Sequence, residues 1–178
     1  MDLREKTIAS KSIYNGKIIK VTLDTVICPG GNEAQREIVR HPGGVAVVPI
    51  DENGYVYMIE QYRIPYDEII LEVPAGKLDK GEDPDCAAAR ELKEETGLTA
   101  ESLVFMGSFY PTVGFCDENL RMYLATGLNQ GEDDPDEDEF VILRKIHIDE
   151  LIEMIMDNKI CDGKTIAALF KAREFLKK

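Results

Sequence analysis

The sequence predicts an α/β fold of the α+β kind, in which a mixed β-sheet packs between helices. Two observations predict it. The first 75 residues form short runs rich in β-branched and aromatic residues, separated by turns that contain glycine or proline. One short helix follows at about residues 83–97, then further strands, and finally two segments with helical periodicity. This order of elements is typical of a layered architecture with a single hydrophobic core region.

The strands expected before the helix are bounded by turn signals. The run at 44–50, GVAVVPI, is apolar almost throughout, so it predicts a central strand buried on both faces. The turn Asp51–Gly54 then returns the chain at 55–62, which we expect to be the hairpin partner of 44–50. The other expected strands cover residues 12–14, 18–27, 36–40 and 69–73, the first two joined at the hairpin signal Asn15-Gly16.

The helix at 83–97 carries signals at both of its ends. Asp83 can cap the first turn, and Pro84 at the first helical position loses no needed hydrogen-bond donor. Gly97 tolerates the left-handed conformation that ends many helices. Beyond it, strands are expected at 103–110, 119–126 and 140–148, and helices at 149–157 and from 162 or 163 to 177.

Composition narrows the function classes. A chain of 178 residues with 44% hydrophobic residues is expected to form one domain, spanning 1–178. The net charge of −13 argues against nucleic acid as a partner, because phosphate-backbone binding needs cations. The absence of a long apolar run predicts no membrane span, and the N-terminus lacks a signal-peptide pattern, so a cytoplasmic protein is expected. The four cysteines show no C-x-x-C pairing, which favours free thiols over zinc or disulfides.

The helix is unusual in its acidic residues. Glu91 and Glu95 are four residues apart and therefore share a face, with Glu94 beside Glu91. Carboxylates held this close repel one another unless a cation lies between them, and hard oxygen ligands suit Mg²⁺, with Mn²⁺ as a substitute. The alternative is a solvated acidic helix face, which is the usual meaning of such a pattern.

The spacing of the whole segment favours the metal-site interpretation. Residues 76–98 follow the pattern G-x5-E-x7-R-E-U-x-E-E-x-G-U, where U is aliphatic, without departure. This segment resembles the Nudix box, and the chain resembles the Nudix hydrolase family. The stretches HPGGVAVVPI, QYRIPY, EVPAGKLDKGED, FYPTVGFCDE and DEDEF extend the resemblance to the ADP-ribose pyrophosphatase branch. The resemblance implies an α/β/α sandwich with residues 1–40 as an N-terminal antiparallel β extension used in a homodimer.

The resemblance also implies roles for the acidic residues. Glu91 and Glu95 would be the principal metal ligands, and Glu82 and Glu94 further ligands or partners. The backbone carbonyl of Ala75 would complete the site. Arg90 would orient the acids rather than touch substrate. A carboxylate in the acidic loop DPDEDEF would act as base or position the water; Glu137 and Glu139 compete for this role, with Glu139 preferred, and the alternative is that the loop is merely solvated.

Substrate contacts are expected outside the helix. The guanidinium fork matches phosphate oxygens, and the family resemblance makes Arg63 in QYR the preferred candidate, with Arg36 and Arg121 as alternatives. An aromatic ring should stack on adenine, and Tyr14 or Phe115 would serve because the chain has no tryptophan. The remaining expected substrate-side residues are Glu72 as a ribose acceptor, Gly76, and Pro111, which matches a proline that marks substrate class in the resembling branch.

The sequence therefore predicts an enzyme that binds a small nucleoside diphosphate. The leading expectation is Mg²⁺-dependent hydrolysis of ADP-ribose to AMP and ribose 5-phosphate. The same chemistry on another nucleoside diphosphate derivative, such as GDP-mannose, NADH or an oxidised nucleotide, is one alternative. A non-catalytic nucleotide sensor of the same fold, regulating a partner protein, is the other.

Overall fold

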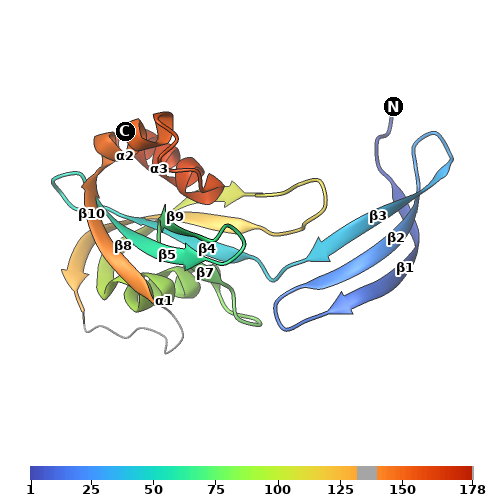
Figure 1. Cartoon of the computed structure of the whole chain (residues 1–178), viewed down its shortest axis with the longest axis horizontal. Helices are drawn as coiled ribbons and strands as arrows, with labels where there is room; N and C mark the ends of the chain where they lie inside the picture. Colours follow the sequence, from blue (N-terminus) through green and yellow to red (C-terminus); the bar gives the residue numbers. More distant parts are fainter. Residues whose placement is uncertain (132–139, 178) are drawn as a thin grey trace. The chain divides into compact units, whose positions relative to one another are not determined.

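The computed structural model describes residues 1–131 and 140–177, which form two compact units (Figure 1). The first unit combines Met1–Gly43 with Tyr110–Asn119, and the second contains the rest of the described chain. In the described part, no helix is long and apolar enough to cross a lipid bilayer. All four cysteines, at positions 28, 86, 116 and 161, are free of disulfide bonds in the described structure.

The first unit is a three-stranded antiparallel sheet of order β1-β2-β3. Strands β1 (Lys6–Asn15) and β2 (Lys20–Ile27) form the hairpin that Asn15-Gly16 predicted, although β1 begins earlier than expected. Strand β3 (Glu33–Arg40) adds to the other edge of β2. The prediction that the N-terminal residues form an antiparallel β extension is confirmed.

Residues 110–119 complete the first unit by lying along β3. The backbone N–H of Val39 donates to the Phe115 carbonyl at 2.7 Å, and the N–H of Asp117 donates to the Val39 carbonyl at 3.1 Å. The Asp117 carboxylate also accepts from Arg40 at 3.2 Å and from the backbone of His41 at 2.8 Å. These bonds fasten a loop from late in the sequence to an early strand.

The second unit is centred on a mixed four-stranded sheet of order β7-β4-β9-β8. Every residue of β4 (Gly44–Pro49) is buried, as expected for a central strand. It pairs parallel with β9 (Leu120–Gln130) and antiparallel with the short β7 (Ala75–Lys77). Strand β8 (Leu98–Phe109) pairs antiparallel with β9 at the sheet edge. The sheet is therefore mixed, as predicted.

The predicted hairpin between the segments 44–50 and 55–62 is wrong. Strand β5 (Tyr55–Arg63) shares only an isolated bridge with the end of β4, between Val56 and Ile50. It belongs instead to a second sheet, of order β10-β5-β6. The physical reason is that β7 and β9 already occupy both edges of β4, so the apolar side chains of β5 pack on a face of the mixed sheet β7-β4-β9-β8. The flanking strands are β10 (Val141–His147) and β6 (Glu68–Glu72).

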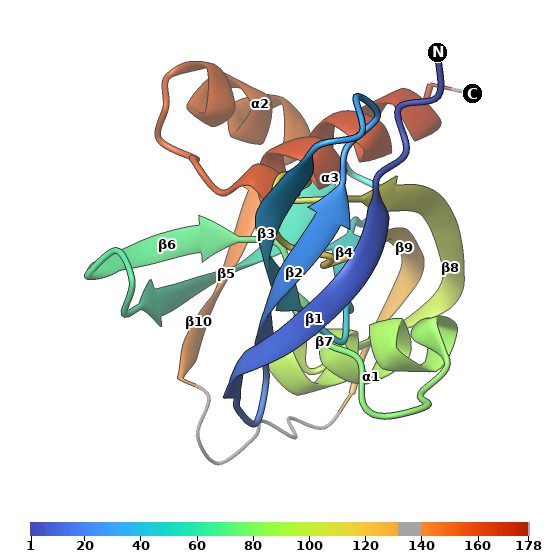
Figure 2. The same cartoon turned by 90° about the vertical axis from the view of Figure 1, so that its right-hand side faces the viewer.

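Three helices cover the two faces of the mixed sheet. Helix α1 (Pro84–Thr96) packs on β4, β7 and β8, while α3 (Gly163–Phe175) packs on β4, β8 and β9 and against α2 (Ile148–Met156). Figure 2 shows α1 on one side of the sheet and α2 and α3 on the other. Alternate residues of β4 accordingly join different cores: Val45 and Val47 face α1, and Ala46 and Val48 face α3. The predicted α/β/α sandwich is confirmed.

Candidate functional site

Helix α1 carries most of the predicted acidic site, and local sequence fixes both of its ends. Asp83 caps the helix by accepting a hydrogen bond from the backbone N–H of Asp85 at 2.9 Å. Gly97 ends it in the left-handed conformation, with φ of 67°, where a side chain would be strained. The helix is anchored to the sheet by an apolar patch of Ala87, Ala88 and Leu92.

Glu91 and Glu95 are buried despite their charge, with 7% and 5% of each residue exposed. The Oε2 atom of Glu95 accepts a hydrogen bond from the backbone N–H of Ala75 at 2.7 Å. The Glu91 carboxylate lies against Gly76, where an added β-carbon would come within 1.9 Å of Glu91 Oε1. Only glycine at position 76 leaves room for this carboxylate. Strand β7 and helix α1 thus form a cradle of two acids against a strand backbone.

Arg90 gathers the other acids around one guanidinium. Its Nε and Nη2 donate to Glu82 at 2.9 and 3.1 Å, and its Nη1 donates to Glu91 at 2.8 Å and Glu94 at 2.7 Å. The hydrogen bonds to Glu82 raise the pKa of Arg90 most, and the same contact lowers the pKa of Glu82. One permanent cation therefore holds together carboxylates that would otherwise repel one another.

A cavity of about 330 Å³ opens beside the cradle. Its lining combines Glu91 and Glu94 of α1 with Ala75 and Gly76 of β7, and Arg63 of β5 faces it as well. Carboxylates, strand backbone and an arginine thus border one space. Such a lining suits an anionic ligand that arrives with a cation to balance the acids.

The cradle supplies oxygen donors of the types that a divalent cation binds. Within residues 1–131 and 140–177, no three His, Cys, Asp or Glu side chains are arranged to hold a metal ion by themselves. The contacts explain this, because the Arg90 guanidinium lies among Glu82, Glu91 and Glu94. The donor types nevertheless fit, since carboxylate and carbonyl oxygens are the ligands that Mg²⁺ and Mn²⁺ prefer. The missing side chain at Gly76 is a second relevant feature, because it lets the Glu91 carboxylate lie against the backbone of β7.

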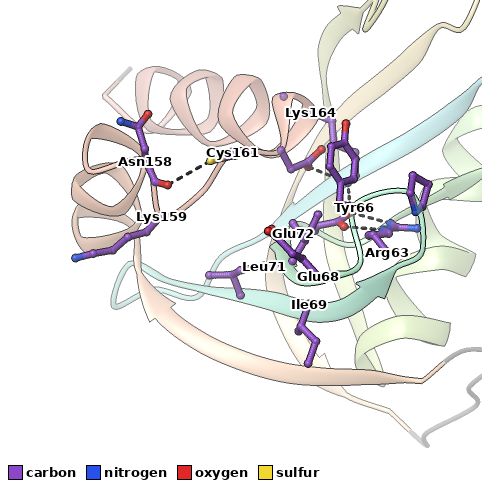
Figure 3. Close-up of a pocket in the computed structure, with 14 residues that line it drawn as sticks. Arg63, Tyr66, Glu68, Ile69, Leu71, Glu72, Asn158, Lys159, Cys161 and Lys164 are labelled. Atoms are coloured by element: carbon purple, nitrogen blue, oxygen red, sulfur yellow. Dashed lines mark hydrogen bonds and ion pairs between the residues drawn. The ribbon is translucent and has the colours of Figure 1, made fainter.

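Arg63 and Glu72, both predicted on the substrate side, contact each other directly. The Nε and Nη2 of Arg63 donate to the two carboxylate oxygens of Glu72, each at 2.7 Å. Glu72 is only 2% exposed, and its Oε2 also accepts from the Nζ of Lys164 (Figure 3). Sequence reasoning missed Lys164, because a lysine at a predicted helix start usually faces solvent. The one available signal was its place two residues after the capping residue Asp162.

The other predicted substrate residues, Tyr14, Arg36, Pro111 and Phe115, lie in the first unit. The aromatic residues Tyr14 and Phe115 are both more than half exposed, at 56% and 54%. Arg36 donates to Glu5 through Nε at 3.0 Å and Nη2 at 2.5 Å. The structure brings the loop of Pro111 and Phe115 alongside β3, the strand that carries Arg36. Glu137 and Glu139 lie outside the described residues, so their role stays a prediction.

The family described as the NUDIX domain matches residues 40–169. The chain therefore belongs to the Nudix hydrolase family.

Curated relatives agree with this family. The chain is 46% identical over 167 residues to the methanol dehydrogenase activator of Bacillus methanolicus, covering 93% of this chain and 90% of the relative. It is 41% identical over 169 residues to the ADP-ribose pyrophosphatase of Bacillus subtilis, covering 94% and 91%. Among solved structures, one described as an ADP compounds hydrolase superposes with a TM-score of 0.87 over 99% of this chain and 97% of that chain. At 22% identity, this likeness speaks for the fold alone.

Proposed function

We propose that this protein hydrolyses the diphosphate bond of ADP-ribose to give AMP and ribose 5-phosphate, with Mg²⁺ as cofactor and Mn²⁺ as a substitute. The observation that carries the proposal is the 41% identity to the B. subtilis ADP-ribose pyrophosphatase across 94% of this chain. The buried pair Glu91 and Glu95 against the β7 backbone supports the same chemistry.

The proposed metal site uses the cradle. Glu91, Glu95 and the carbonyl of Ala75 would hold the ion, with Glu82 and Glu94 as further ligands or partners. A bound divalent cation would neutralise the diphosphate and lower the pKa of a coordinated water. The role proposed for Arg90 is to orient Glu91 and Glu94, in keeping with its hydrogen bonds of 2.8 and 2.7 Å to them.

The proposed reaction is a displacement by water at one phosphorus of the diphosphate. The water oxygen forms a bond to that phosphorus while the bond between the same phosphorus and the bridging oxygen breaks. The bridging oxygen leaves with the other phosphate. Glu139, or Glu137 as the alternative, would accept the proton of the water. Arg63 would bind the diphosphate oxygens, since it lines the cavity beside the cradle.

Recognition of the rest of the substrate would use exposed aromatic and polar groups. Tyr14 or Phe115 would stack on adenine, for which their exposed rings are suited. Glu72, predicted from sequence as a ribose acceptor, is 2% exposed and its carboxylate already accepts from Arg63 and Lys164, so it would contact ribose only after rearrangement. Gly76 would be a point of close approach. Arg36 and Pro111 complete the proposed substrate-side set.

The proposal includes the assembly. A single 178-residue Nudix domain in the cytoplasm would form a homodimer, with residues 1–40 as its dimerisation extension. The exposed apolar residues of that segment, Ile8, Ile13 and Ile18, support a second copy as their cover. Light scattering of the whole protein should give the mass of two chains, and a monomer at micromolar concentration would rule this part out.

The decisive experiment compares kcat/KM for ADP-ribose, GDP-mannose, NADH and 8-oxo-dGDP with Mg²⁺, and repeats the preferred reaction after chelation. ADP-ribose should be preferred by about tenfold or more, a difference of about 1.4 kcal/mol in transition-state binding. Preference for another substrate would support the proposed diphosphate hydrolysis but reject ADP-ribose as the preferred substrate. Unchanged turnover after chelation would end the metal assignment.

A second function is favoured by one specific observation, the 46% identity to a methanol dehydrogenase activator over 93% of this chain. In this alternative, the protein stimulates a partner dehydrogenase. Adding the protein to a methanol dehydrogenase and measuring its rate tests this directly. If stimulation disappears in Glu95→Gln, activation of the dehydrogenase depends on the same site as hydrolysis. If stimulation survives, the protein acts on the dehydrogenase as a non-catalytic regulator.

A further inference from the structure

We propose that Lys164, at the start of α3, is a positioning residue for substrate binding: acting through buried Glu72, it keeps the Arg63 guanidinium oriented and its charge available to the diphosphate. We call Arg63, Glu72, Lys164 and Asp162 the α3 relay. The inference rests on the proposed function, which places Arg63 at the diphosphate.

Arg63 is held in a way that leaves one side of its guanidinium for a ligand. Nε and Nη2 are both used by Glu72, at 2.7 Å each. For Nη1, no hydrogen-bond partner is found within residues 1–131 and 140–177. Arg63 also lines two cavities, the one beside the cradle and one of about 460 Å³ between the β5–β6 hairpin and the α2–α3 connection (Figure 3). The bidentate bond therefore fixes the plane of the guanidinium at the edge of the proposed active site.

The other end of the relay is anchored in the first turn of α3. Lys164 Nζ contacts Glu72 Oε2 and donates to Asp162 Oδ2 at 2.8 Å, and the Lys164 side chain is only 13% exposed. Asp162 caps the helix and accepts from the N–H and the hydroxyl of Thr165, at 3.0 and 2.6 Å. The same hydroxyl accepts from the backbone N–H of Val73 at 3.0 Å. One helical turn thus holds both the Glu72 side chain and the strand end beside it.

Positive and negative side chains alternate along the α3 relay, so its two ends carry opposite charges. Arg63 is the positive end and faces the cavity of Glu91, while Asp162 is the negative end and lies at the α3 N-terminus. The helix dipole stabilises a negative charge at that position. Burial acts to raise the pKa of Asp162, but Lys164 and Thr165 outweigh it and the pKa is lowered. The Glu72 contact raises the pKa of Arg63.

Lys164 decides how much of the Arg63 charge reaches the cavity. With Lys164 present, the Glu72 carboxylate is shared between two cations. Without Lys164, Glu72 and Arg63 would form an ion pair with no net charge. This ion pair would attract a diphosphate less strongly than the three residues together. The effect should appear in substrate binding more than in the chemical step, because Arg63 stands beside the cradle rather than within it.

The test uses Lys164→Met in the full chain, with steady-state kinetics on ADP-ribose. We expect the KM to rise about fivefold to tenfold, less than for loss of a direct charged hydrogen bond because Lys164 acts through Glu72, while kcat changes by less than about twofold. Lys159→Met is the matched control. Lys159 lines the cavity of about 460 Å³, as Lys164 does, but it pairs with Asp157 at 3.1 Å and lies outside the α3 relay. Its KM should match that of the parent protein.

A double-mutant cycle with Arg63→Ala separates positioning from general structural damage. If Lys164 acts through Arg63, Lys164→Met should change the KM by less than about twofold in the Arg63→Ala background. A structural role would give the same factor in both backgrounds and would overturn the inference, as would an unchanged KM in Lys164→Met alone. If Lys164→Met does not fold, Lys164→Gln keeps a donor for Asp162, removes the charge and makes the same test.

Failure of the proposed function has a different signature. If Arg63→Ala alone leaves the KM unchanged, the diphosphate role of Arg63 is wrong and the inference falls with it. If Arg63→Ala raises the KM and Lys164→Met does not, the proposed function stands and only the α3 relay is rejected.

Discussion

Glu95 Oε2 accepts a hydrogen bond of 2.7 Å from the backbone N–H of Ala75, which ties the last turn of α1 directly to strand β7. Ala75 is in turn paired with Ala46 on β4, the most buried strand of the second unit. The carboxylate is therefore positioned relative to the centre of the sheet rather than to a surface loop. A group held on rigid elements in this way is suited to a precise chemical role.

The first prediction follows from this tie. Glu95→Gln keeps the shape of the side chain and an oxygen that can accept from Ala75, but it removes the charge that a metal ion requires. We expect kcat for ADP-ribose with Mg²⁺ to fall by about 100-fold or more, with the melting temperature little changed. Glu150→Gln, on an exposed position of α2, is the control and should retain the parent rate. A fall of less than about tenfold would reject Glu95 as a principal ligand.

The second prediction concerns the glycine of the cradle. In Gly76→Ala, the new β-carbon would lie 1.9 Å from Glu91 Oε1, so the carboxylate or the strand must move. We expect kcat to fall by about 100-fold, because small displacements of a positioned group are costly. Gly30→Ala provides the comparison, since its β-carbon meets only the side-chain oxygen of Asn32, at 3.3 Å. Parent-like kcat in Gly76→Ala would show that the position of the Glu91 carboxylate is not critical.

Helix α1 could be predicted from sequence because its signals are local. Asp83 and Gly97 act within a turn of the helix ends, and the structure shows the cap and the left-handed residue where the sequence placed them. The order of strands and helices followed from similarly short patterns. What a strand pairs with is decided by distant residues, so the hairpin expected for β4 and β5 was wrong: the edges of β4 are taken by β7 and β9.

The candidate site shows the same division. Spacing along one helix placed Glu91 and Glu95 together, since the helical repeat fixes neighbours four residues apart. The contact between Lys164 and Glu72 joins residues 92 positions apart, and no local pattern encodes it. A buried acid at position 72 could be recognised only once the fold showed it to be 2% exposed.

The third prediction concerns stability at different pH. Asp162→Asn keeps an N-cap acceptor but removes the charge that faces Lys164, and we expect it to lower the free energy of unfolding by about 2 kcal/mol at pH 7. The pKa of Asp162 in the folded protein is below its ordinary value of 3.8. Its charge therefore stabilises the fold fully above about that pH, and the contribution disappears as pH falls through the lowered pKa.

Denaturant unfolding of both proteins from pH 7 downward measures this difference. The gap between parent and Asp162→Asn should be constant from pH 7 to about pH 5 and should narrow as pH falls below 3.8. Glu37→Gln, at an exposed position of β3, should show almost no gap at any pH. A gap that widens toward acid would contradict the lowered pKa.

The fourth prediction concerns a hydrogen bond that holds α1 on the sheet and should affect stability but not activity. Tyr123 on β9 is 2% exposed, and its hydroxyl donates to Asp85 Oδ1 in the first turn of α1 at 2.7 Å. Burial raises the pKa of Tyr123, so the hydroxyl stays protonated as a donor at any working pH. Tyr123→Phe removes the bond, and exposed Asp85 can turn to water. We expect a loss of about 1 kcal/mol in the free energy of unfolding.

Activity should respond differently, because neither Tyr123 nor Asp85 borders the cavity beside the cradle. We expect kcat and KM of Tyr123→Phe to stay within about twofold of the parent, as the packing of Ala87, Ala88 and Leu92 still holds α1 on the sheet. Tyr55→Phe is the matched control: Tyr55 is 41% exposed and should lose neither stability nor activity. A tenfold fall in kcat for Tyr123→Phe would show that this one hydrogen bond, rather than the apolar patch, sets the position of the acidic residues.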